Sequence, residues 1–115
     1  MVKTQKEMER EVRERMRDGK GSVEIVHVFK KEELRGRTRL FARLVLQPGS
    51  SIGYHIHESE EEIFYIIRGS ARVNDNGVEK TAGAGDAILT GGGAGHSIEC
   101  TGSKPLELLA VILSW

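Results

Sequence analysis

The sequence predicts an all-β barrel or jelly roll preceded by one α-helix, and three observations lead to this fold class. After Gly21 the chain is a series of short apolar runs rich in β-branched residues, each ended by glycine, proline or Asn-Gly. Helical periodicity is confined to the first twenty residues. The 115 residues are enough for about one domain, so we expect residues 1–20 to be a helical arm that packs on the barrel or on a dimer partner, and residues 21–115 to be the barrel.

Residues 4–18 carry the pattern of an amphipathic helix. Thr4 and Glu7 have the spacing of a capping box, in which each side chain accepts a hydrogen bond from the other residue's backbone N–H. Apolar residues recur at four-residue intervals and would form a narrow stripe: Met8, Val12 and Met16. The glycines at 19 and 21 would end the helix, because glycine adopts the left-handed conformation at little cost.

The remaining chain predicts strands separated by turns. Asn76-Gly77 marks a hairpin, because both residue types tolerate positive φ. Residues 30–34 form either a short helical turn or a loop. The expected strands are 22–29, 39–46, 56–67, 71–73, 78–81, 86–90, 96–100 and 106–113.

Composition excludes several classes of protein. Lysine and arginine together number 17, as do aspartate and glutamate, so no basic excess points to nucleic acid. The first residues contain no apolar run typical of a secretory signal, and no stretch approaches the roughly 20 apolar residues of a spanning helix. The lone Cys100 rules out an intramolecular disulfide. We therefore expect a cytoplasmic protein that binds neither nucleic acid nor membrane.

Three histidines and one glutamate have the spacing of a metal site. His55 and His57 are two residues apart, so on a strand their side chains point to the same face, about 7 Å apart along the chain. Glu62 follows an acidic turn that can reverse the chain, and His96 supplies a third imidazole. Three neutral nitrogens and one carboxylate suit a divalent transition metal. On an octahedral ion they leave two positions open.

Two segments resemble the motifs of the cupin family. The first, Gly49-x5-His55-x-His57-x4-Glu62-x6-Gly69, is similar to the first cupin motif at every fixed position. The second resembles the other motif with two departures, glycine for proline and cysteine for asparagine: it reads Gly85-x5-Gly91-x-Gly93-x2-His96-x3-Cys100. The resemblance covers about residues 37–113. It implies a double-stranded β-helix barrel with one metal near its mouth, and it favours a homodimer.

The metal is expected to be manganese or iron because of the mixed nitrogen and oxygen ligands, with zinc and nickel as alternatives. With Glu62 ionised, such a site carries a net charge of about +1, so it favours a small carboxylate or similar anion. The resemblance is to oxalate decarboxylase-like and dioxygenase-like cupins, which implies a decarboxylase, dioxygenase or isomerase. Oxalate decarboxylases have an arginine where this chain has Ile52. The alternative is a module that binds the anion without turnover.

Three further residues are candidates for catalysis. His27 lies among apolar residues and would act as an acid or base if it lines the pocket; its alternative is a structural role. Arg43 would bind a substrate carboxylate, or else extend from the outer face of the sheet. Tyr65 is a further candidate acid or base.

The last predicted strand, 106–113, is apolar on both faces. One face would join the barrel core, and the other requires a cover, because a large exposed apolar patch is rare on a monomer. The stripe of Met8, Val12 and Met16, from the same chain or a partner, is one candidate. A homodimer is the expected assembly.

Overall fold

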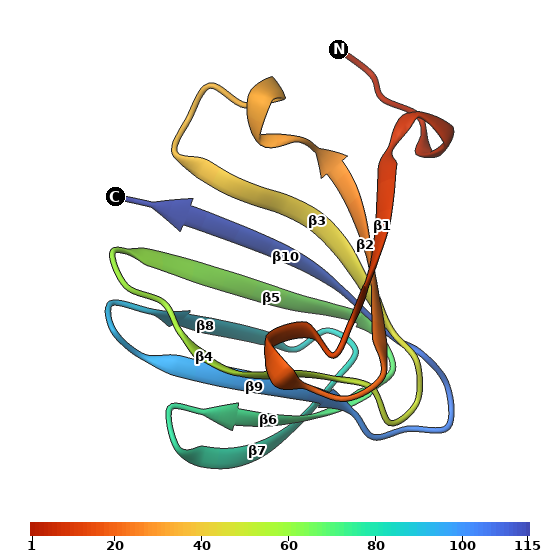
Figure 1. The fold of residues 1–115 in the computed structure, drawn as a ribbon, viewed down its shortest axis with the longest axis vertical. Helices are drawn as coiled ribbons and strands as arrows, with labels where there is room; N and C mark the ends of the chain where they lie inside the picture. The colour runs from red at the N-terminus through yellow and green to blue at the C-terminus, as the bar shows by residue number, and fades with distance from the viewer.

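The computed structural model describes residues 1–115 and consists of two antiparallel sheets that face each other (Figure 1). One sheet has six strands in the order β1-β2-β3-β10-β5-β8, and the other has four in the order β4-β9-β6-β7. The all-β prediction is confirmed. The strands are β1 (Glu9–Glu14), β2 (Ser22–Phe29), β3 (Thr38–Leu46), β4 (Ser51–Ile56), β5 (Glu60–Arg68), β6 (Ser70–Asp75), β7 (Val78–Gly83), β8 (Ala87–Gly91), β9 (Gly95–Cys100) and β10 (Leu106–Ser114).

Three short 3-10 turns complete the fold, namely η1 (Gln5–Glu7), η2 (Met16–Asp18) and η3 (Lys31–Glu33). None of these helical segments has the length and apolar character needed to cross a membrane. The predicted strand 56–67 is wrong in one respect, because the chain turns at residues 57–59 and so divides this stretch between β4 and β5. Ser59 adopts a φ of 55° in that turn.

The core lies between the two sheets and follows the alternation of each strand. Leu44, Phe64 and Leu108 come from the six-stranded sheet, whereas Val73 and Ile98 come from the opposite sheet. Apolar side chains every second residue therefore meet in one closed layer, as the hydrophobic pattern predicts. Phe64 links this layer to the histidine cluster described below, because its ring stacks on that of His96.

The predicted N-terminal α-helix is wrong, because residues 9–14 form a strand. β1 pairs with β2 along its whole length, from Glu9 opposite His27 to Glu14 opposite Ser22. The Thr4 N–H does donate to the Glu7 carboxylate at 3.1 Å, but the capped segment is a single 3-10 turn. Pairing with β2 satisfies the backbone groups on the side of β1 that faces β2, and the strand divides the alternating Glu and Arg residues between two faces.

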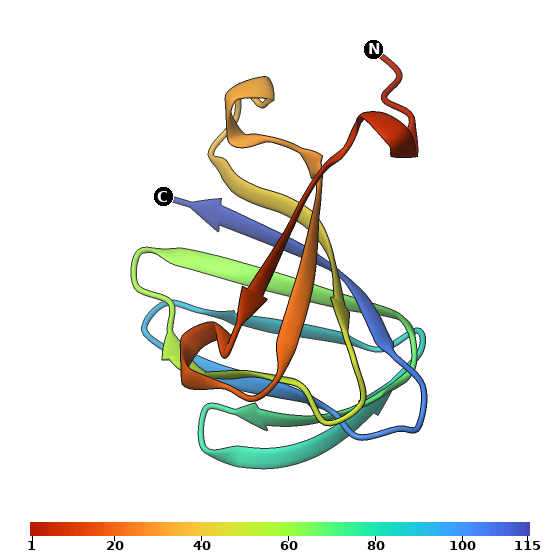
Figure 2. The ribbon, with the colours of Figure 1, turned by 45° about the vertical axis from the view of Figure 1, so that its right-hand side comes forward.

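Residues 15–21 form a tight bend, here called the N-terminal hook, which lies against β4 (Figure 2). The Ser51 N–H donates to the Lys20 carbonyl at 2.8 Å. A Cβ on Gly53 would lie 1.9 Å from the carbonyl oxygen of Arg17, so the hook approaches β4 as closely as glycine allows. Gly19, which was predicted to end a helix, instead packs closely on β4, where an added Cβ would lie 2.2 Å from the Ser51 carbonyl oxygen.

The outward face of β10 retains the half-buried apolar side chains Leu109, Val111 and Leu113. The stripe proposed to cover it does not exist, because Val12 is 61% exposed on β1 whereas Met16 packs against the core. No other part of the chain is known to cover this face. The homodimer stays a prediction that would bury it.

Candidate metal centre

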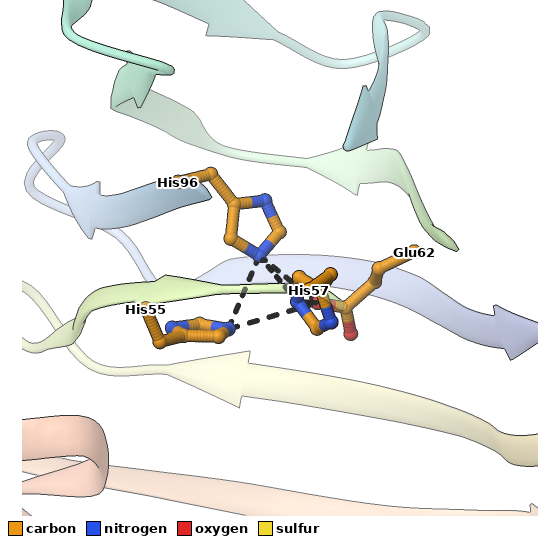
Figure 3. A group of neighbouring side chains, drawn as sticks. All are labelled: His55, His57, Glu62 and His96. Carbon is orange, nitrogen blue, oxygen red and sulfur yellow. Dashed lines mark hydrogen bonds and ion pairs between the residues drawn. The ribbon is translucent and has the colours of Figure 1, made fainter. Parts of the chain in front are cut away.

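The structure brings together the four residues proposed as metal ligands (Figure 3). His55 lies on β4 opposite His96 on β9, and His57 follows directly after β4. Glu62 extends inward from β5 of the facing sheet. Each residue offers one nitrogen or oxygen atom as a ligand, and these four atoms all lie within 4.8 Å of one another. The cluster therefore joins the two sheets of the barrel.

The separations between these atoms fit donors that share one ion. With metal–nitrogen bonds of about 2.1 Å, ligands at a right angle lie about 3.0 Å apart and opposite ligands about 4.2 Å apart. The His57 and His96 Nε2 atoms are 3.1 Å apart, and those of His96 and His55 are 3.2 Å apart. Glu62 Oε1 lies 3.0 Å from Nε2 of both His57 and His96, and 4.0 Å from that of His55. These five separations lie close to the octahedral values, and the sixth, between His55 and His57, is at most 4.8 Å.

The hydrogen bonds of the outer ring nitrogens orient two of the imidazoles. His57 Nδ1 lies 2.5 Å from Glu60 Oε2, and His55 Nδ1 lies 2.7 Å from the carbonyl oxygen of Gly53. A carboxylate and a carbonyl only accept, so each Nδ1 donates and each neutral ring directs an Nε2 lone pair into the cluster. Lone pairs that converge beside an ionised carboxylate are balanced either by protons on the rings or by a cation between them, so this donor set fits a metal ion.

Burial and neighbouring polar groups shift the pKa values of the cluster in opposite directions. Burial alone would raise the pKa of Glu62, but where protons occupy the Nε2 atoms of His55, His57 and His96 in place of a metal ion, their hydrogen bonds hold it well below its usual range. The hydrogen bond with Glu62 raises the pKa of His57 against the effect of burial, and Glu60 adds to the rise. Burial lowers the pKa of His96, whose ring stacks on Phe64. The site thus keeps an anionic glutamate and attracts positive charge.

Sequence analysis missed the residues that support His57. Glu60 holds the ring through Nδ1 and is itself held by Arg39, through two hydrogen bonds of 3.0 and 2.9 Å. Such a carboxylate–histidine arrangement fixes the ring orientation and raises the basicity of the ligating nitrogen. The acidic stretch 58–61 was a visible signal, but only the turn after β4 shows which glutamate reaches the histidine.

Substitution of Glu60 by glutamine should weaken metal binding roughly 10- to 100-fold, because the amide is a weaker acceptor for the His57 N–H. Titration with Mn²⁺ monitored by calorimetry would measure this change. Glu61→Gln is the matched control, since it removes the same charge one residue away and should leave the affinity unchanged. Equal affinities for wild type and Glu60→Gln would contradict the prediction.

A cavity of about 100 Å³ opens beside the cluster. His55, His57 and Glu62 form part of its wall. The rest is a mixed apolar and cationic lining that comes largely from the N-terminal region and β3, and includes Arg13, Met16, Arg17, His27, Arg39, Leu40 and Ile52. Sequence analysis missed the arginines of the N-terminal region, because it predicted a helical arm there and no part of the cavity wall.

Only one of the three proposed catalytic residues lies in this cavity. His27 lines it, and its Nε2 lies 2.8 Å from Glu11 Oε2. Arg43 lies on the outward face of β3, where it forms an ion pair with Glu107 at 3.0 Å. Tyr65 is 47% exposed on the outward face of β5. The structure does not bring Arg43 or Tyr65 to the metal ligands.

This barrel, with its histidines and glutamate gathered at one opening, is the architecture that the motifs imply. Residues 42–112 match the family model of the cupin domain. The chain therefore belongs to the cupin family.

Two matches from Thermotoga maritima cover most of the chain. An oxalate-binding protein is 51% identical over 98 residues, which are 85% of this chain and 81% of the relative. The crystal structure of a predicted oxalate decarboxylase is 47% identical, with a TM-score of 0.95 over the full length of both chains. A polyketide cyclase from Streptomyces resistomycificus shares the fold at 19% identity, with a TM-score of 0.77 over 98% of this chain and 80% of its own.

Proposed function

We propose that this cupin holds one divalent transition metal on His55, His57, Glu62 and His96, and that the metal binds a small carboxylate. The observation that carries the proposal is the convergence of three imidazole nitrogens and a buried carboxylate at one end of an open cavity. Manganese or iron suits this donor set best, and zinc and nickel are the alternatives. The bound ion would act as a Lewis acid that polarises a carboxylate oxygen.

The charge of the site supports an anionic ligand. A divalent ion with an ionised Glu62 has a net charge of about +1, and the adjoining wall adds arginines rather than further carboxylates. The similar protein of Thermotoga maritima is named an oxalate-binding protein, which supports the same class of ligand. A cavity of about 100 Å³ favours a molecule of a few heavy atoms.

Turnover of the carboxylate is a second candidate function, and His27 is the observation that favours it. Its ring lines the cavity, and the hydrogen bond to Glu11 holds the ring in place. The hydrogen bond to His27 is also the main reason why the pKa of the Glu11 carboxyl is lowered. A histidine oriented in this way by a carboxylate is suited to accept a proton from a ligand in the cavity.

Calorimetry and NMR with the metal-loaded protein test both functions. We expect binding of oxalate and other small carboxylates at the metal-loaded site, and none after the metal is removed by chelation. Product signals in the NMR spectrum, with or without oxygen, would establish turnover, and binding without product would favour the binding function. If no carboxylate binds, both candidates are wrong.

A further inference from the structure

Three arginines line the cavity beside the metal ligands, and two of them are already neutralised. Arg39 forms two hydrogen bonds with Glu60. Arg13 Nε lies 2.7 Å from Glu11 Oε1. Arg17 lines the same cavity and has no carboxylate partner. It is therefore the one arginine of the cavity wall whose charge is unbalanced.

The backbone around Arg17 adopts an unfavourable conformation. Arg15, Arg17 and Asp18 have φ angles of 51°, 55° and 62°, in the left-handed region that residues other than glycine rarely adopt. Three such residues within four positions persist only where the surrounding structure holds them, and strain of this kind is concentrated at functional sites. The N-terminal hook thus presents Arg17 in a fixed backbone position.

The hook is fixed to the strand that carries His55. The carbonyl oxygen of Arg17 lies against Gly53, at a distance that excludes any Cβ. The Gly53 carbonyl accepts the hydrogen bond from His55 Nδ1. Ser51 and Lys20 bind each other twice, through backbone N–H to carbonyl and through backbone N–H to hydroxyl, both at 2.8 Å. One rigid unit therefore carries both a candidate metal ligand and the unpaired arginine.

We propose that Arg17 determines specificity by binding the anionic group of the ligand that faces away from the metal, so that the pocket selects small dianions over monoanions. This rests on the proposed carboxylate site. A guanidinium donates two parallel hydrogen bonds to a carboxylate, which suits the second carboxylate of a dicarboxylate. Arg17 also raises the net charge of the site from about +1 to about +2, which a dianion balances and a monoanion does not.

The test compares Arg17→Gln with Arg15→Gln in the metal-loaded protein. Arg15 is a matched control because it lies in the same hook, has a similar φ and loses the same charge, yet does not line the cavity. Calorimetry would measure the affinity for oxalate, a dianion, and for glycolate, a monoanion of similar size. In Arg17→Gln we expect oxalate affinity to fall about tenfold or more and glycolate affinity to fall less than about threefold. Arg15→Gln should bind both as wild type does.

Metal content and Tm are measured first for each variant. Loss of metal in Arg17→Gln would show a structural role and overturn the proposal. Equal losses for the two ligands, or the same loss in Arg15→Gln, would also overturn it while leaving the carboxylate site intact. Partial recovery of oxalate affinity in Arg17→Lys, which keeps the charge without the planar fork, would support it. Failure of the wild-type protein to bind either ligand would instead overturn the carboxylate site itself.

Discussion

Replacement of His57 by alanine should lower metal affinity by more than about 100-fold, because loss of a ligand costs more than the 10- to 100-fold typical of its supporting residues. His57 is 1% exposed and lies 3.0 Å from Glu62 and 3.1 Å from His96, at the centre of the cluster. Its removal also leaves Glu60 and Glu62 without their shared hydrogen-bond partner. Elemental analysis of the purified protein would measure occupancy, which should be about one ion per wild-type chain.

His27→Gln is the control for this experiment. His27 lines the same cavity but makes its hydrogen bond to Glu11, so its loss should leave metal occupancy unchanged. The triple variant His55→Ala, His57→Ala, His96→Ala should purify without the metal. Full occupancy in the triple variant would show that the ion binds elsewhere and would overturn the assignment of the centre.

Substitution of Gly53 by alanine should destabilise the protein by about 1–3 kcal/mol or more, the usual cost of forced overpacking. The added Cβ would lie 1.9 Å from the carbonyl oxygen of Arg17 and 2.9 Å from its carbonyl carbon, so backbone must move on one side of the contact. We expect Tm to fall by at least about 5 °C. Displacement of the hook should also weaken metal binding, because Gly53 orients His55.

Gly36→Ala is the matched control. A Cβ there meets nothing within 4 Å, and the residue does not have a positive φ. The substitution should be neutral, or should stabilise the protein by about 0.4–1 kcal/mol by restricting the unfolded chain. Thermal melting of the two variants side by side measures the difference. A Tm for Gly53→Ala equal to that of Gly36→Ala would contradict the close packing of the hook on β4.

Local patterns in the sequence were sufficient for the barrel and for the identity of the cluster. Alternating apolar residues and turn residues determine which segments become strands, because each strand buries every second side chain. The spacing of His55, His57, Glu62 and His96 likewise predicts a shared site, since two histidines two apart on a strand lie on one face. The strand pattern and the spacing of His55, His57 and Glu62 depend on neighbours a few residues away, whereas His96 was assigned through the second cupin motif. Both kinds of signal are visible without a tertiary structure.

The first twenty residues depended on contacts that a local pattern does not contain. Met8, Val12 and Met16 have a helical spacing, yet β2 offers a full-length partner and residues 9–14 become a strand. Arg43 and Tyr65 were candidates for the pocket, with the outer face of the sheet as the alternative for Arg43, and the structure places both on the outward faces of their strands. Glu60 was only one of several acidic residues until the turn brought it to His57.

Sequence by itself therefore determined the class of fold and the four candidate ligands of this cupin, because strand periodicity and the two motifs can be recognised along the chain. Tertiary structure alone decided what surrounds those ligands: the hook on Gly53, the arginines of the cavity wall and the support of His57. The contacts between the hook and β4, for example, join residues that are more than thirty positions apart in the sequence. The energy of such a contact depends on the distance between the residues in space and not on their separation along the chain.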